Sequence, residues 1–253
     1  MANMLSVVEQ ANSIHNPFIF SNMIKLTIDK KRYSIPERLT VKQWKQLITF
    51  DFSDYFQYSK IIASLIGAPH EKVAQCTEDS QILAVGFIIQ LMNQRKEHKV
   101  KDFNDITFGD FVDLDIYIVM GIEKHMDEIL DILTPEGKET TKWADEAMWL
   151  IDRYTQFRVF TYRQYSGLFG INSNGEQDID EDDLESHDPK KIAKGWYAVL
   201  IDLSDNDIQK IDYVTDQPLK KVLNFMAYRK EQQLKENQRL MQQKRQLEAN
   251  RRK

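Results

Sequence analysis

The stretch that most constrains the fold runs from Lys142 to Gly170, KWADEAMWLIDRYTQFRVFTYRQYSGLFG. No residue before Gly167 breaks a helix, and large apolar side chains recur at the i, i+3, i+4 spacing of one helical face. Because so many aromatic side chains need cover, we predict a long central helix, roughly 38 Å at 1.5 Å per residue. The side chains of this helix that we expect in the core are Trp143, Leu150, Tyr154 and Phe157.

Arginines enter this helix late, at Arg153, Arg158 and Arg163. Positive charge near a helix C-terminus is favoured by the helix dipole, and of the three only Arg163 falls among the polar positions of the pattern.

The clearest strand signal is at residues 23–36, where apolar and polar residues alternate through MIKLTID and again after Lys30-Lys31. This alternation predicts a two-stranded β-hairpin. Residues 1–22 show no such pattern, and we expect them to form an arm that lies on another surface.

Helix-start signals follow at Thr40-x-x-Gln43 and Thr107-x-x-Asp110, which have the spacing of a capping box. Gly67 followed by Pro69 predicts a helix end. The expected helices before the central one cover about 41–49, 55–66, 78–96, 108–121 and 122–133. The longest apolar run, ILAVGFIIQLM at 82–92, is too short to span a bilayer; it predicts a buried helix and no membrane segment.

Charge is divided unevenly after the central helix. Residues 176–188 contain eight acids and no Lys or Arg, whereas residues 229–253 contain nine Lys or Arg and three Glu. Such blocks repel themselves and favour docking surfaces. We expect an acidic linker at 171–187, and then a helix that begins at Asp188-Pro189 and buries Trp196.

From about Pro218 the sequence reads as helix to its end, with few apolar residues beyond Tyr228. We expect this helix to project and to bind a partner, and its heptads specify a coiled coil only weakly. The residues expected to bind are Leu234, Leu240, Met241 and Leu247, together with Lys235, Arg239, Lys244 and Arg245. The predicted fold is therefore mostly α: a multi-helix body with a small N-terminal β-hairpin over 23–170, and a C-terminal helical segment over 188–253.

Chemical motifs are not recognisable in the chain. The acidic block lacks the glycine and final glutamate of an EF-hand loop, Cys76 is the only cysteine, and no two of the five histidines have His-Glu-x-x-His spacing. We therefore expect no enzyme, no catalytic residue, no metal site and no cofactor. Nonspecific contact between the basic C-terminus and nucleic acid stays open.

Four blocks carry a family resemblance: YSIPERLTVKQWKQL, ITFGDFVDLDIYI, YRQYSGLFG and PLKKVLNFMAYRKEQQLKENQRL, which lie between residues 33 and 240. In their residue pattern and their order along the chain, these blocks resemble proteins from the structural modules of tailed bacteriophages, especially crAss-like gut phages. The resemblance implies a protein of the virion or of tail assembly, made in the cytoplasm of the bacterial host.

On this resemblance we expect a non-enzymatic structural subunit of the phage particle, in the portal, neck or tail region, including the portal–tail connector. Such a subunit would form homo-oligomers and bind other phage structural proteins. The alternative is a tail-assembly chaperone that is absent from the mature particle. A nucleic-acid-associated particle protein is a third class.

Overall fold

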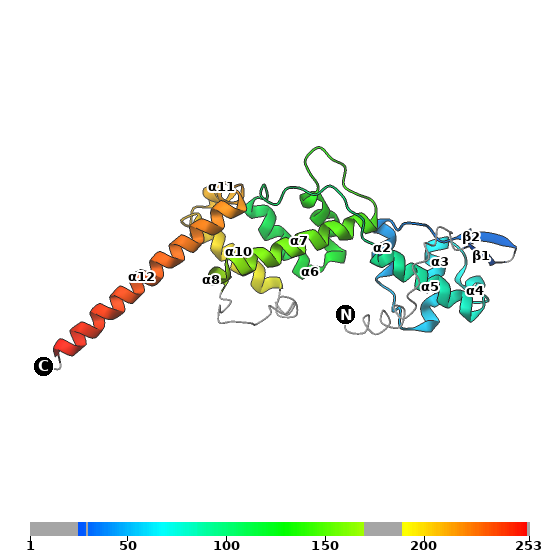
Figure 1. Cartoon of the computed structure of the whole chain (residues 1–253), viewed down its shortest axis with the longest axis horizontal. Helices are drawn as coiled ribbons and strands as arrows, with labels where there is room; N and C mark the ends of the chain where they lie inside the picture. The colour runs from blue at the N-terminus through cyan, green and yellow to red at the C-terminus, as the bar shows by residue number, and fades with distance from the viewer. Residues whose placement is uncertain (1–24, 29, 170–188, 252–253) are drawn as a thin grey trace. The chain divides into compact units, whose positions relative to one another are not determined.

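The computed structural model describes residues 25–28, 30–169 and 189–251, with side chains up to residue 246. Its described part is mostly helical with one antiparallel two-stranded sheet (Figure 1), which confirms the predicted fold class. The chain divides into two compact units, Met1–His98 with Thr140–Leu150, and Lys99–Glu139 with Ile151–Lys253. The predicted arm at 1–22 and the acidic linker at 171–187 lie outside the described residues.

The hairpin of unit 1 pairs β1 (Lys25–Ile28) with β2 (Lys31–Ser34), as the alternation predicts. Lys25 lies opposite Ser34, and Ile28 lies opposite Lys31. Leu26 and Ile28 are buried in the core of this unit. Period-2 alternation thus places the apolar side chains of β1 on one face, toward the helices.

Two of the predicted signals in unit 1, a helix start and a helix end, are present in the structure. Thr40 forms the capping box with Gln43: the Gln43 N–H donates to the Thr40 hydroxyl, and the Thr40 N–H donates to the Gln43 side chain at 2.9 Å. Gly67 ends the second helix with a φ of 66°, a left-handed conformation that glycine adopts without strain. The elements are α2 (Val41–Leu47), the 3-10 turn η1 (Tyr55–Gln57), α3 (Tyr58–Ile66), α4 (His70–Val73) and α5 (Glu78–Asn93).

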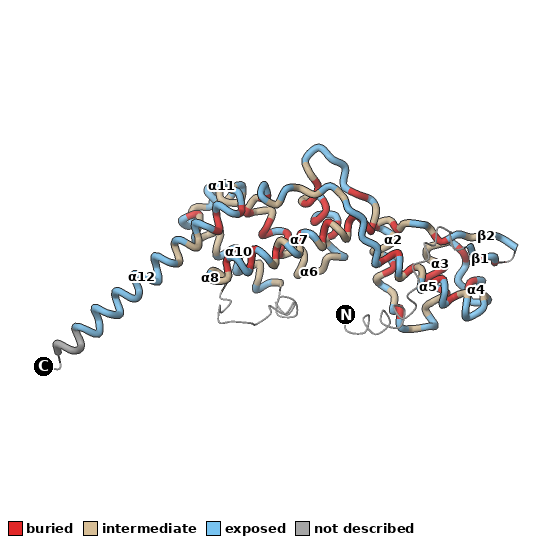
Figure 2. Tube along the Cα trace, in the orientation of Figure 1, coloured by how far each residue is buried: buried red, intermediate tan, exposed pale blue. Residues whose placement is uncertain are grey.

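Helix α5 differs from the buried helix that its apolar run predicts. Ala84, Val85 and Ile88 are buried, but Ile82 is 49% and Leu83 is 64% exposed. Figure 2 shows exposed and buried segments alternating along the helices of this unit. An apolar run predicts burial on all sides, but unit 1 supplies cover for only one side of α5.

Unit 2 begins with α6 (Phe108–Leu133), which starts at the predicted Thr107–Asp110 capping box. Its backbone leaves helical geometry at Gly121, where φ is 116° and ψ is 114°. This kink lies where the sequence divides 108–121 from 122–133. A Cβ on Gly121 would meet only the flexible end of the Glu123 side chain, at 2.7 Å, so it is the positive φ that favours glycine here.

The central helix is shorter than predicted: α7 covers Ala144–Gln164, Tyr165 forms a turn, and α8 covers Ser166–Phe169. The Leu168 N–H donates to the Tyr165 carbonyl at 2.8 Å, so a tighter i+3 turn replaces the α-helical ladder there. The boundary between the units falls within α7, between Leu150 and Ile151.

The predicted core side chains differ in burial. Leu150 and Tyr154 have no exposed area and Trp196 is 6% exposed, whereas Trp143 and Phe157 are half-buried. The Phe157 ring stacks on Phe103 at 4.7 Å between centroids, and the Arg38 guanidinium covers Trp143 at 4.6 Å.

The C-terminal segment contains α10 (Pro189–Leu203), the 3-10 turn η2 (Ile208–Lys210), α11 (Ile211–Thr215) and α12 (Leu219–Arg251). Asp207 caps η2 and accepts from the Gln209 N–H. Ser204 donates back to the Ile201 carbonyl at 3.1 Å at the end of α10.

Replacing Leu150 by Ala should lower the free energy of unfolding by about 2–5 kcal/mol, because the lost methyl groups leave a cavity in a closed site. Phe157→Ala should cost less, about 2 kcal/mol, since part of that ring is exposed to water in the folded state. Urea denaturation followed by circular dichroism measures both. A larger loss for Phe157→Ala than for Leu150→Ala would contradict this burial pattern.

Candidate assembly surface and its supporting contacts

The first third of α12 is fixed to unit 2. Leu219, Val222 and Leu223 are buried. Arg229 pairs with Asp202 of α10 at 3.0 Å, and Lys230 Nζ donates to the carbonyl of Leu168 at 3.3 Å. These contacts end at Lys230, close to the point at which the sequence predicts that the helix leaves the body.

Beyond Lys230 every described residue of α12, from 231 to 246, is exposed (Figure 2). Leu234, Leu240 and Met241 are 54%, 52% and 64% exposed. The predicted basic residues of this surface are exposed beside them: Lys235, Arg239, Lys244 and Arg245. Leu247 belongs to α12, but its side chain lies outside the described residues.

Local sequence explains why this segment is helical without packing. Its residues are mainly Gln, Lys, Arg, Glu and Leu, which have high helix propensity. Glu231 and Lys235 also form an i,i+4 ion pair at 2.5 Å, a pair that stabilises an isolated helix by about 0.2–0.5 kcal/mol. Such a surface can offer a partner both apolar contact and positive charge.

A buried polar cluster stabilises the unit from which α12 extends. Asp115 of α6 accepts from Arg158 Nε at 2.5 Å, from the Tyr162 hydroxyl at 2.9 Å and from Trp196 Nε1 at 2.8 Å. All four side chains are buried. The cluster thereby joins α6, α7 and α10.

The sequence places Arg158 late in its helix, where the dipole favours positive charge; in the structure Arg158 is 5% exposed and pairs with Asp115 in the core. Burial lowers the pKa of Arg158, but the Asp115 carboxylate outweighs burial and raises it. A signal for the pair is present, because Asp115 shares a helical face with Phe108, Phe111 and Val112. An acid on an apolar face predicts a buried partner.

Two buried tyrosines of α7 differ in one respect. The Tyr162 hydroxyl donates to Asp115, whereas the Tyr154 hydroxyl has no hydrogen-bond partner among the described residues. Burial raises the pKa of both, so both hydroxyls keep their protons at neutral pH.

Tyr154→Phe should therefore leave the free energy of unfolding unchanged or raise it, because it removes a buried hydroxyl that makes no hydrogen bond to a described residue. Tyr162→Phe should lower it by about 1–3 kcal/mol, since Asp115 loses a donor in the interior. The two substitutions remove the same atom from the same helix and serve as controls for each other in urea denaturation. Equal effects would contradict the assigned hydrogen bonding.

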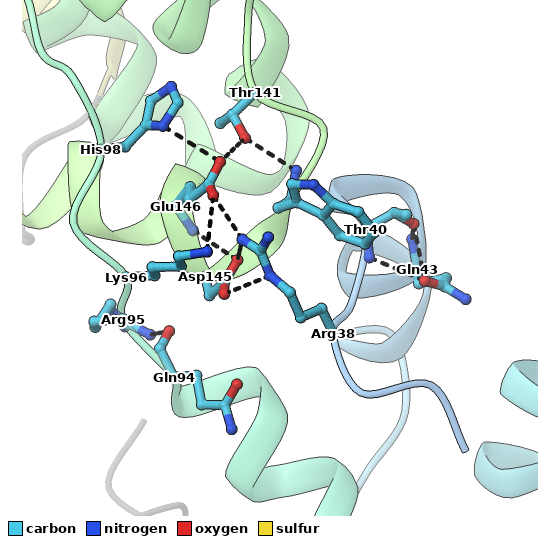
Figure 3. Close-up of polar contacts among 11 residues, drawn as sticks. Arg38, Thr40, Gln43, Gln94, Arg95, Lys96, His98, Thr141, Asp145 and Glu146 are labelled. Carbon is cyan, nitrogen blue, oxygen red and sulfur yellow. Dashed lines mark hydrogen bonds and ion pairs between the residues drawn. The ribbon is translucent and has the colours of Figure 1, made fainter. Parts of the chain in front are cut away.

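A second polar cluster, in unit 1, holds the start of α7 (Figure 3). Arg38 Nε donates to Asp145 Oδ2 at 2.9 Å, and Arg38 Nη2 donates to Glu146 Oε1 at 2.7 Å. Glu146 Oε2 accepts from the Thr141 hydroxyl at 2.6 Å, and His98 Nδ1 lies 3.3 Å from the same oxygen. These contacts join the segment before α2, the segment after α5 and the first turn of α7.

Stability should depend on the ionisation of Glu146. Burial by itself raises the pKa of Glu146, but hydrogen bonds from Thr141 and Arg38 and the charge of Arg38 bring it below the ordinary value of 4.5. A lowered pKa stabilises the fold above the unfolded value, and that contribution is lost as the pH falls through the folded pKa. The stability difference between wild type and Glu146→Gln should thus be largest at neutral pH and shrink below about pH 4.5.

Urea midpoints at pH 7 and at pH 3 measure this difference. Glu97→Gln, at an exposed position of the same unit, is the matched control and should show no such trend. A Glu146→Gln difference that persists at low pH would show that ionisation is not the cause.

Among the described residues, no three His, Cys, Asp or Glu side chains gather as they would around a metal ion. The described helices include none that is long and apolar enough to cross a bilayer. Comparisons of the chain with protein-family models, with curated proteins and with solved structures gave no match.

Proposed function

We propose that this chain is a non-enzymatic structural subunit of a tailed-bacteriophage particle, located in the portal, neck or tail region, that acts by assembling with other proteins. The observation that carries the proposal is the exposed part of α12, residues 231–246. The resemblance of four sequence blocks to phage structural modules supports the particle as its location.

The exposed segment of α12 is costly without a partner. Isolated helices of about this length are marginal in water, and most helical stability in proteins comes from packing. Leu234, Leu240 and Met241 nevertheless keep about half or more of their surface in water. A second protein surface that covers them would stabilise the helix and bury this apolar area.

Substituting all three apolar residues, Leu234→Gln, Leu240→Gln and Met241→Gln, should leave the melting temperature unchanged, because none of them packs on unit 2. The same variant should be depleted at least tenfold from purified particles, as measured by quantitative mass spectrometry. The matched control is Gln232→Ala with Gln243→Ala on the opposite face of α12, which should enter particles normally.

The wild-type chain separates the structural subunit from the tail-assembly chaperone. A structural subunit is found in purified particles at a fixed copy number. A chaperone is absent from them and co-purifies with a tail protein from infected cells, and that result would refute the proposal. A variant that unfolds would show instead that distal α12 belongs to the core of unit 2.

A further inference from the structure

The exposed face of α5 is a second surface without cover among the described residues. It is formed by four residues at i, i+4, i+7 and i+11: Asp79, Leu83, Gly86 and Gln90, all exposed. Ile82 beside them is 49% and Leu83 is 64% exposed. Two neighbouring large apolar side chains that stay exposed on one helix are consistent with an interaction site.

Gly86 makes close approach to this face feasible. A Cβ built on Gly86 would meet no heavy atom within 4 Å, so the glycine is not required by packing inside unit 1. In the middle of a helix, glycine costs about 1 kcal/mol relative to alanine. A surface glycine on an apolar face instead allows another helix to lie close.

The distal part of α12 has the same residue spacing. Leu234, Gln238, Met241 and Arg245 also lie at i, i+4, i+7 and i+11, and all four are exposed. The two faces carry opposite charges, Asp79 on α5 and Arg245 on distal α12.

We propose that distal α12 of one copy packs antiparallel on the α5 face of a second copy. In this register Arg245 meets Asp79, Met241 meets Leu83, and Gln238 lies over Gly86. On each helix the apolar residue and the charged residue are four positions apart, about 6 Å along an α-helix. The apolar contact and the ion pair can therefore form together. Antiparallel packing also places the helix dipoles in a favourable arrangement.

This inference rests on the proposed assembly role and adds the partner. The contact joins two different surfaces, so it is heterologous and generates a ring or a filament. The competing arrangement, α12 against α12, would bring two basic segments together, which opposes association.

Two variants provide the test, and each of them keeps only one of the two helix faces intact. Leu83→Asp destroys the α5 face, and Leu234→Asp with Met241→Asp destroys the α12 face; the substituted residues are exposed, so the fold should persist, as circular dichroism would verify. In sedimentation velocity at micromolar concentration, the wild type should form larger oligomers and each variant alone should be monomeric. Their equimolar mixture should form a 1:1 dimer and nothing larger, because only one functional contact remains.

An exchange of charges tests the register. Asp79→Arg alone and Arg245→Asp alone should each weaken association at least fivefold, and the double variant should recover most of it. Glu136→Arg, at an exposed loop position, changes the net charge as Asp79→Arg does and should have little effect.

Normal self-association of Leu83→Asp, or a mixture that stays monomeric, would overturn the inference. A monomeric wild type would overturn it as well. None of these three results decides the proposed function, which is tested by the presence of the chain in particles.

Discussion

The ion pair between Asp115 and Arg158 is the interaction on which unit 2 depends. Neither charge is tolerable alone in the interior, because the desolvation penalty is several kcal/mol per ion. The hydroxyl of Tyr162 and the indole of Trp196 donate to the same carboxylate, so the buried charge is shared among several donors. Since these residues come from α6, α7 and α10, the three helices hold one mutual arrangement, and the base of α12 packs against α6 and α8.

Features that depend on near neighbours in the sequence were predictable. The capping boxes at Thr40 and Thr107, the helix end at Gly67 and the alternation in β1 are each encoded within a few residues, and the structure contains all of them. The exposed end of α12 was predictable for a related reason. A long polar helix with few apolar residues has nothing with which to pack on its own unit.

What the sequence reading missed depends on distant residues. The sequence shows where Arg158 lies in its helix, but not that Asp115, 43 positions earlier, lies beside it. The exposure of α5 was missed because an apolar run indicates that burial is favourable, but not which neighbour supplies the cover. Phe160 shows the same limit, since it lies in the aromatic central helix and is 63% exposed. Where apolar side chains are buried by another molecule, the sequence of one chain shows only that these side chains favour burial.

The position of Trp196 has a spectroscopic consequence. The chain has four tryptophans, and Trp44, Trp143 and Trp149 belong to unit 1, which leaves Trp196 alone in unit 2. Its indole is buried, packs edge-on against Phe108 and Phe111, and donates to the Asp115 carboxylate. A chain in which the other three are replaced by phenylalanine therefore emits from one indole next to the buried ion pair. The emission wavelength of Trp196 reports whether water has reached that pair, so the interior of unit 2 contains an intrinsic fluorescent probe.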